Sequence, residues 1–293
     1  MASLIDIGLG GVFHAAIIFL VAAGLQLVFG VQKIINLACG SFYALGAYFG
    51  ITAIAFANSM GMSPLLVLPA LVLAGFIIGL VGIPIERVLR TVYRRDESFQ
   101  LLLTFGLLLM FQDVFRFFWG PTPQTLNNAY LAYGTANIFG AQVPTYNLLV
   151  ILASILIALG LGAILQRTRI GRIVRATAEN RDMTEALGVD SKKVFAVVFT
   201  VGCMLGTIGG ALVVPAGAAS LEMAVELVVE AFAVVVIGGL GSMRGAVVGA
   251  LIVGLIRAVA IIVFPEAEIL SIYLVVIAVL ILRPAGLFGK AAA

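Results

Sequence analysis

The chain has 293 residues, of which 62% are hydrophobic and only 11% are charged, and its mean hydropathy is +1.20. Soluble domains are about 45–50% apolar and about 25% charged, so this composition excludes a water-soluble globule. A helix needs about 20 apolar residues to cross a bilayer, so the length allows about eight to ten spans. We therefore predict one transmembrane domain over residues 1–293, an all-α bundle, because the apolar runs lack the alternation of a barrel.

The residue inventory excludes most enzyme classes. His14 is the single histidine, so no histidine pair can bind zinc. Only Lys290 follows a glycine, and the other residues of a Walker A phosphate loop are missing around it, so we expect no ATP site and no cofactor in this chain. Cys39 and Cys203 lie far apart in apolar runs, which favours buried free thiols. The net charge of +3 comes from arginine-rich loops and indicates membrane orientation rather than a nucleic-acid partner.

Apolar runs between helix breakers predict the membrane spans. In chain order the candidate spans are residues 11–30, 34–57, 65–85, 99–118, 147–166, 194–214, 227–241, 246–264 and 268–282. All are predicted to be helices, because a helix satisfies its own backbone hydrogen bonds in lipid.

Lysine and arginine gather in alternate connections between these spans. The basic connections contain Arg87, Arg90, Arg94 and Arg95 in one loop, Arg167, Arg169, Arg172, Arg175, Arg181, Lys192 and Lys193 in another, and Arg283 and Lys290 in the tail. The connections at 58–64, 119–146 and 215–226 contain neither residue type. The positive-inside rule therefore places the basic loops and the C-terminus in the cytoplasm. Nine spans put the N-terminus outside; the alternative is eight spans, with 31–57 partly re-entrant and the N-terminus inside.

Glycines are spaced for close helix contact. Small residues four apart form the patterns Gly46-xxx-Gly50, Gly75-xxx-Gly79, Gly202-xxx-Gly206-xxx-Gly210 and Gly245-xxx-Gly249. Helix backbones approach closely over such ridges, so the pattern predicts a tightly packed bundle. It does not distinguish a transporter from a channel or a membrane enzyme.

Two glycine-interrupted segments, residues 30–41 and 238–245, occupy roughly corresponding places in the two halves. Paired interruptions indicate discontinuous helices that line a transport path, although a plain turn explains 238–245 at least as well. We take the first segment and its flanks as the candidate translocation path; the candidate residues are Gln26, Asn36, Gly40, Ser41 and Tyr43. For the polar side chains among them, hydrogen bonding between helices is an equally good interpretation.

Arg257 lies deep in a predicted span, where a charge is costly and therefore a functional candidate. Glu226 and Glu230, one helical turn apart on the preceding span, are candidate partners, and a lipid headgroup is the alternative. With one histidine and no chain of acids expected at matching depth, the sequence does not predict a proton relay.

The loop at 167–193 is too long and too patterned for a simple connector. We predict one helix from Arg172 to Leu187, ended by Gly188, with Arg175, Glu179 and Asp182 on one face. Such a helix inserts into a partner or lies in the lipid headgroups, and a solvated interfacial helix is the alternative.

At this loop the sequence resembles a known family. Residues 171–190 (GRIVRATAENRDMTEALGVD) resemble the cytoplasmic coupling loop of branched-chain amino acid ABC importer permeases, the LivH/LivM family. Residues 35–48 (INLACGSFYALGAY) resemble the motif of the LivH side, and 236–249 (VIGGLGSMRGAVVG) and 282–289 (LRPAGLFG) resemble two further signatures. Cys39 stands where the family often has histidine, and Met243-Arg244 replaces an uncharged residue and proline. These departures leave the solute open, since permeases of this family also serve urea, short amides and aromatic acids.

The resemblance implies a permease subunit of an ATP-driven importer in the bacterial inner membrane, which is not itself an enzyme. Its implied partners are a second homologous permease, ABC ATPase subunits that bind ATP and Mg²⁺, and an extracytoplasmic solute-binding protein. The residues it implies for ATPase coupling are Arg175, Ala178, Glu179, Asn180, Glu185, Leu187 and Gly188. The competing hypotheses are an ion-coupled carrier or channel and a membrane-embedded enzyme; the enzyme would show acids, His or Cys clustered at one depth.

Overall fold

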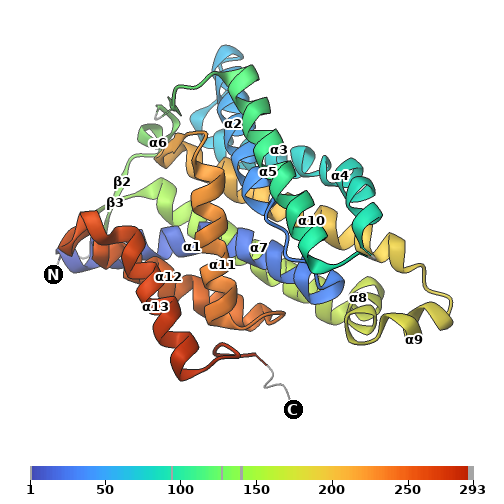
Figure 1. The fold of residues 1–293 in the computed structure, drawn as a ribbon. Helices are drawn as coiled ribbons and strands as arrows, with labels where there is room; N and C mark the ends of the chain where they lie inside the picture. The colour runs from blue at the N-terminus through green and yellow to red at the C-terminus, as the bar shows by residue number, and fades with distance from the viewer. Residues whose placement is uncertain (1, 94, 127, 139–140, 290–293) are drawn as a thin grey trace.

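A computed structural model describes residues 2–93, 95–126, 128–138 and 141–289. The α-helices run side by side in one bundle (Figure 1). Its helices are α1 (Ala2–Gln32), α2 (Cys39–Ser59), α3 (Val67–Gly79), α4 (Gly82–Leu89), α5 (Glu97–Trp119), α6 (Asn128–Ala132), α7 (Thr145–Arg167), α8 (Arg169–Glu179), α9 (Arg181–Ala186), α10 (Ser191–Val213), α11 (Met223–Gly238), α12 (Met243–Val263) and α13 (Glu268–Leu282), with the 3-10 turns η1 (Pro64–Leu66), η2 (Arg90–Val92), η3 (Val214–Ala216) and η4 (Pro265–Ala267).

Each predicted span overlaps one helix or, for 65–85, the consecutive helices η1, α3 and α4, which confirms the polytopic helical bundle. Within the described residues, seven helical segments are long and apolar enough to cross a membrane, and Leu270–Leu282 is a shorter apolar helix. The segment predicted at 227–241 lies in α11, which has 16 residues and is therefore short of the about 20 needed to cross alone. The choice between eight and nine spans stays a prediction.

The centre of the bundle consists of α1, α2 and α10. About 72% of the apolar window is buried in α2 and in α10, against 11% in α7, so α7 lies at the periphery. The predicted glycine ridges are the contact surfaces: a Cβ atom at Gly46 would overlap the Thr207 carbonyl, and one at Gly210 would overlap the Tyr43 carbonyl. Glycine is therefore required where α2 and α10 cross, as the spacing predicts.

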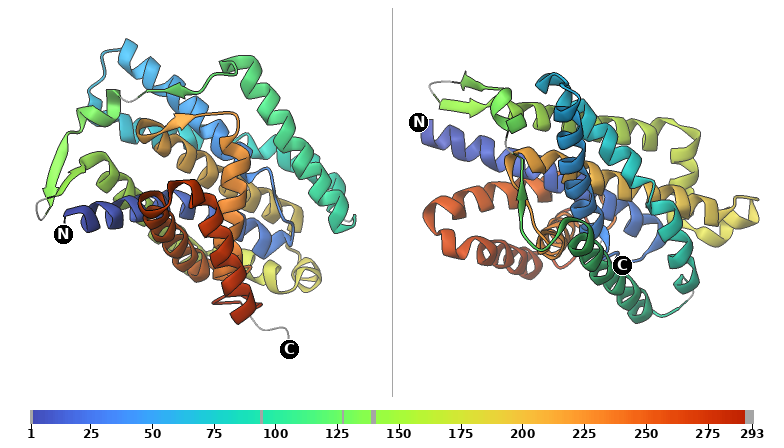
Figure 2. Two further views of the ribbon diagram at one scale, coloured as in Figure 1. Left: turned by 60° about the vertical axis from the view of Figure 1, so that its left-hand side comes forward. Right: turned by 90° about the horizontal axis from the view of Figure 1, so that it is seen from above.

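Two short antiparallel ribbons lie outside the helices. β1 (Gln124–Thr125) pairs with β4 (Ala218–Ala219), and β2 (Thr135–Ile138) pairs with β3 (Ala141–Pro144). The β2–β3 hairpin lies at the same end of the bundle as the N-terminus, and α8 and α9 lie at the opposite end (Figure 2). The functional candidates divide between these two ends.

The structure corrects the prediction of one continuous helix from Arg172 to Leu187. α8 ends at Glu179 and α9 begins at Arg181, because Asn180 adopts an extended conformation (φ −151°, ψ 102°). Asparagine is a strong N-cap residue, and here its side chain starts a new helix. Arg175 and Asp182 consequently lie on different helices and do not share one helical face.

Candidate functional site

The segment α8–α9 begins with a sharp reversal after α7. The hydroxyl of Thr168 accepts a hydrogen bond from the Gly171 amide at 3.1 Å and so caps α8. A Cβ atom at Gly171 would overlap the carbonyl oxygens of Ile164 and Leu165. Glycine at this position therefore lets α8 fold back against the end of α7.

Polar contacts between residues close in sequence hold α9 and the turn that leads from it to α10. The Asn180 side chain accepts a hydrogen bond from the Met183 amide at 2.9 Å, and Arg181 Nε lies 2.9 Å from Glu185 Oε1. The Ser191 hydroxyl donates to the same Glu185 oxygen and so ties α9 to the first residue of α10. Gly188 has φ +87°, which only glycine adopts readily, and turns the chain between them. These contacts give the segment a defined shape.

The outer surface of α8–α9 combines charge with exposed apolar side chains. Met183 is 60% exposed and Leu187 is 78% exposed. Glu179 is exposed on α8, and Ala178 is half-buried beside it. Exposed apolar side chains on a charged helical segment are compatible with contact to a partner protein or to lipid headgroups.

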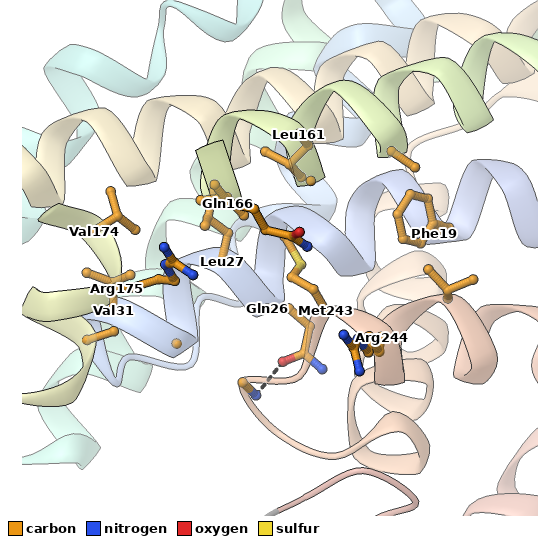
Figure 3. A pocket seen from close by; sticks show the side chains of 17 residues that line it. Phe19, Gln26, Leu27, Val31, Leu161, Gln166, Val174, Arg175, Met243 and Arg244 are labelled. Atoms are coloured by element: carbon orange, nitrogen blue, oxygen red, sulfur yellow. Dashed lines mark hydrogen bonds between the residues drawn. The ribbon is translucent and has the colours of Figure 1, made fainter. Parts of the chain in front are cut away.

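The inner side of α8 forms a wall of a cavity of about 790 Å³ (Figure 3). The cavity lies between α1, α7, α8 and α12, and its polar lining residues are Gln26, Gln166, Arg175 and Arg244. Phe19, Leu27 and Leu161 supply apolar walls. The cavity therefore brings one predicted path residue, Gln26, together with two predicted coupling residues, Arg175 and Ala178.

Gln26 fixes the turn between α11 and α12. Its side-chain amide donates to the Gly239 carbonyl at 2.9 Å, and its oxygen accepts from the Gly241 amide. Gly239 and Gly241 have φ of +95° and +81°, so the turn requires glycine at both positions. A Cβ atom at Gly30 would contact Gly241 at 3.9 Å. The two glycine-interrupted segments of the sequence therefore meet at this turn.

The other predicted path residues lie inside the packed bundle. The chain leaves α1 at Gln32, and the Asn36 side chain accepts a hydrogen bond from the Ala38 amide at 3.1 Å before α2 begins. Gly40 is pressed against the Ala224 carbonyl of α11, and Ser41 and Tyr43 are buried. The void beside Asn36 measures only about 10 Å³. Their role as a solute path stays a prediction.

A charged cluster lies toward the other end of the bundle. Arg257 Nη1 on α12 lies 2.6 Å from Glu230 Oε1 on α11 and 2.7 Å from His14 Nε2 on α1. Arg257 Nε also pairs with Glu268 on α13. His14 Nε2 lies 3.1 Å from Glu230 Oε2, which closes the network. Four helices are therefore joined by one set of charges.

The sequence indicates only part of this cluster. It proposed Glu226 and Glu230 as partners of Arg257, and the structure confirms Glu230. His14 and Glu268 were not among the predicted partners, and the structure brings both into contact with Arg257. The signal available in the sequence is depth in the membrane. When nine spans are counted, all four residues lie within about two helical turns of the span ends on one side of the membrane.

Comparison with known proteins agrees with this architecture. The family model described as "Branched-chain amino acid transport system / permease component" matches residues 8–283. The chain is 28% identical over 280 residues to the high-affinity branched-chain amino acid transport permease BraD of Pseudomonas aeruginosa, covering 92% of this chain and 91% of that protein. It is 29% identical over 280 residues to the permease LivH of Escherichia coli K12, with the same coverage.

Among solved structures, PsaBC from Streptococcus pneumoniae in complex with Fab aligns with a TM-score of 0.49 and 12% identity, covering 92% of this chain and 87% of that one.

The match of the family model extends over nearly the whole chain, from α1 to the end of α13. This chain therefore belongs to the family of permease components of branched-chain amino acid transport systems.

Proposed function

We propose that this chain is the permease subunit of an importer that moves branched-chain amino acids, or related small amides, across the bacterial inner membrane. Transport is driven by separate ABC ATPase subunits, which bind ATP and Mg²⁺. The chain pairs with a second homologous permease, and an extracytoplasmic binding protein delivers the solute. Family membership and the apolar helices of a multi-pass membrane protein support this proposal.

The observation that carries the proposal is the double role of α8. Its outer side joins the exposed surface that includes Glu179, Met183 and Leu187, where an ATPase can dock. Its inner side places Arg175 and Ala178 in the wall of the 790 Å³ cavity, which Gln26 also lines. A displacement of α8 by the ATPase therefore changes the cavity directly, without a long chain of intermediate contacts.

In this proposal the predicted coupling residues act in three ways. Glu179 and Leu187 contact the ATPase, and Arg175 and Ala178 transmit its movement to the cavity. Asn180, Glu185 and Gly188 maintain the bent shape of α8–α9, through the cap, the ion pair and the positive φ described above.

The coupling test is the charge reversal Glu179→Lys in the assembled importer. We expect loss of leucine uptake and of solute-stimulated ATP hydrolysis, with an unchanged amount of folded protein in the membrane. The matched control is Glu222→Lys, an equally exposed acid before α11, which should transport normally. Wild-type uptake by the Glu179→Lys variant would contradict the proposal.

The path proposal requires its own test. We propose that solute passes residues 26–43 in another conformation of the importer, so Asn36→Leu and Ser41→Leu should reduce flux without reducing docking of the binding protein. Parental transport rates in both variants would show that these residues serve only helix packing.

Orientation completes the proposal: α8–α9 and the C-terminus lie in the cytoplasm, as the basic loops predict. The test uses Leu187→Cys and Glu222→Cys in a background lacking Cys39 and Cys203, because Leu187 precedes the long helix α10 and Glu222 follows its other end. We expect an impermeant thiol reagent to label the second from outside and the first only from the cytoplasm. A reversed labelling pattern would contradict this orientation. A cysteine at Ser3 then distinguishes nine spans from eight.

A further inference from the structure

A second cavity, of about 300 Å³, lies between α11, α12 and α13, away from α8–α9. Its volume is at the lower end of the about 300–1,000 Å³ typical of small-molecule sites. Three carboxylates and one guanidinium line it: Glu226, Glu230, Glu268 and Arg257. It therefore gathers charges of both signs near one end of an apolar bundle, where charged groups are candidates for a functional role.

The rest of the lining is apolar or aromatic. Val225 and Val229 come from α11, and Ile272 and Tyr273 come from α13. Branched aliphatic side chains on two facing helices form a wall that suits another branched aliphatic group. The cavity thus combines charged side chains of both signs with a wall of aliphatic side chains.

The charged groups of the cavity are not all engaged. Arg257 uses Nε for Glu268 and Nη1 for Glu230 and His14, while its Nη2 makes no hydrogen bond to the described residues. Glu226 is exposed to the cavity and forms no ion pair within the described part of the chain. One donor group and one carboxylate are therefore available to a ligand.

We propose that this cavity is a recognition site for an α-amino acid with a branched aliphatic side chain, an inference that rests on the proposed function. The ligand ammonium group lies between Glu226 and Glu230, which are one helical turn apart on α11. Its carboxylate accepts hydrogen bonds from the free nitrogen of Arg257, and its side chain packs on Val225, Val229 and Ile272.

The balance of charge selects for an amino group. Three carboxylates and one guanidinium leave an excess of two negative charges when His14 is neutral. A zwitterionic amino acid leaves this excess unchanged but offers an ammonium group to Glu226 and Glu230, a carboxylic acid without an ammonium group increases the excess, and a neutral amide has no cationic group to pair with them. The site therefore distinguishes amino acids from the neutral amides that share their transporter family, and it does so in the permease itself rather than in the binding protein.

Substitution of Glu226 tests ligand binding without removing an ion pair that holds the helices together. Glu230, Arg257 and Glu268 hold helices together, so their replacement disturbs the bundle as well as the site. Glu226 has no such partner among the described residues, and Glu226→Gln keeps its size while removing its charge. Glu222→Gln is the matched control, since this exposed acid is one turn earlier and does not line the cavity.

The experiment measures binding of radiolabelled leucine to the complete permease–ATPase complex in lipid nanodiscs, without the binding protein. We expect saturable binding to the wild type, about tenfold or more weaker binding to Glu226→Gln because a charge-assisted hydrogen bond is lost, and unchanged binding to Glu222→Gln. Unlabelled isoleucine should compete, whereas 4-methylpentanoate, which lacks the amino group, and acetamide should not.

Three results would overturn the site: no saturable leucine binding to the wild-type complex, equal affinity in Glu226→Gln, or competition by acetamide as strong as by isoleucine. Leucine uptake by cells carrying the whole importer separates these from a failure of the proposed function. Uptake without a Glu226-dependent site overturns this inference alone. Absence of uptake of every aliphatic amino acid overturns the function, and the site with it.

Discussion

The two ends of the bundle are built in different ways. The α8–α9 end is made of consecutive residues, 168–191, and is held by helix caps and by contacts between residues close in sequence. The charged cluster at the other end joins His14, Glu230, Arg257 and Glu268 from four helices. A local structure can be replaced piece by piece, whereas the cluster depends on the whole bundle being assembled.

The two ends also differ in what their charges contribute. Arg181 and Glu185 are about one third exposed or more, so water competes for both groups. The side chain of Glu230 is 10% exposed and that of Arg257 is 26% exposed. If one partner is removed, the remaining charged group therefore has neither an ion-pair partner nor full hydration. Substitutions at the two ends should therefore differ strongly in their effect on stability.

The largest effect is expected from Glu230→Leu. The change removes the carboxylate that contacts both Arg257 and His14, and breaking such a buried pair costs about 3 kcal/mol or more of unfolding free energy. Thermal unfolding of the purified protein in detergent should show a clearly lower midpoint. Glu226→Leu, one turn away on the same helix and without an ion pair among the described residues, is the control. Equal midpoints for the two variants would mean that the cluster does not stabilise the bundle.

A smaller effect is expected from Gln26→Leu. Gln26 lines the cavity beside α8 and holds the turn between α11 and α12, the helices that carry Glu230 and Arg257. The change removes two hydrogen bonds and leaves the Gly241 amide without its partner, while the Gly239 carbonyl keeps only the hydrogen bond from the Ser242 amide, at a cost of about 1–3 kcal/mol. Gln166→Leu is the control, because Gln166 lines the same cavity and makes no hydrogen bond within the described residues. If both variants unfold at the same denaturant concentration, the turn is held by other contacts.

Features that depend on local pattern could be predicted from the sequence. The spans follow from apolar runs, and the glycine spacing correctly indicates the ridges where α2 and α10 touch. The location of the α8–α9 segment was predicted, but its break was not, because Asn180 also fits an uninterrupted helix when the chain is read by apolar periodicity alone. Its capping preference was the available signal.

Features that depend on the partners of each helix could not be predicted in the same way. No rule of spacing joins His14 and Glu268 to Arg257, since both contacts arise only when α1 and α13 pack on α12. Similarly, Gln26 and the turn at Gly239 are distant in sequence, so their pairing required the structure. Depth along the membrane axis is the one coordinate that the sequence supplies for such residues.

A further, smaller effect is expected from Asn180→Ala at the α8–α9 end. Loss of the N-cap costs about 1 kcal/mol of helix stability. Because α9 has only six residues, hydrogen exchange of its amides should accelerate while that of α10 is unchanged. Asn180→Asp keeps a capping oxygen and should retain protection. Equal protection in the alanine variant would show that the ion pair of Glu185 is sufficient to hold α9.

The smallest effect is expected from Arg181→Gln, and its salt dependence sharpens the contrast between the two ends. The change removes an exposed ion pair with Glu185 and the contact of the guanidinium with the Phe195 ring, whose centroid lies 5.0 Å away. Exposed pairs contribute about 1 kcal/mol or less. Because the Debye length falls from about 10 Å at 0.1 M salt to about 3 Å at 1 M, the ionic part of this cost should decrease with salt.

The cost of Glu230→Leu should decrease less, since the Glu230 side chain is only 10% exposed, against 34% for Arg181 and 42% for Glu185. Unfolding measured for both variants and the wild type at low and high salt provides the comparison, with Arg181→Lys as the control that keeps the charge. An equal response of both variants to salt would mean that ions reach the cluster as readily as they reach the α8–α9 surface. The four-helix charge network would then be an open, hydrated site, and its strength would have to come from geometry rather than from burial.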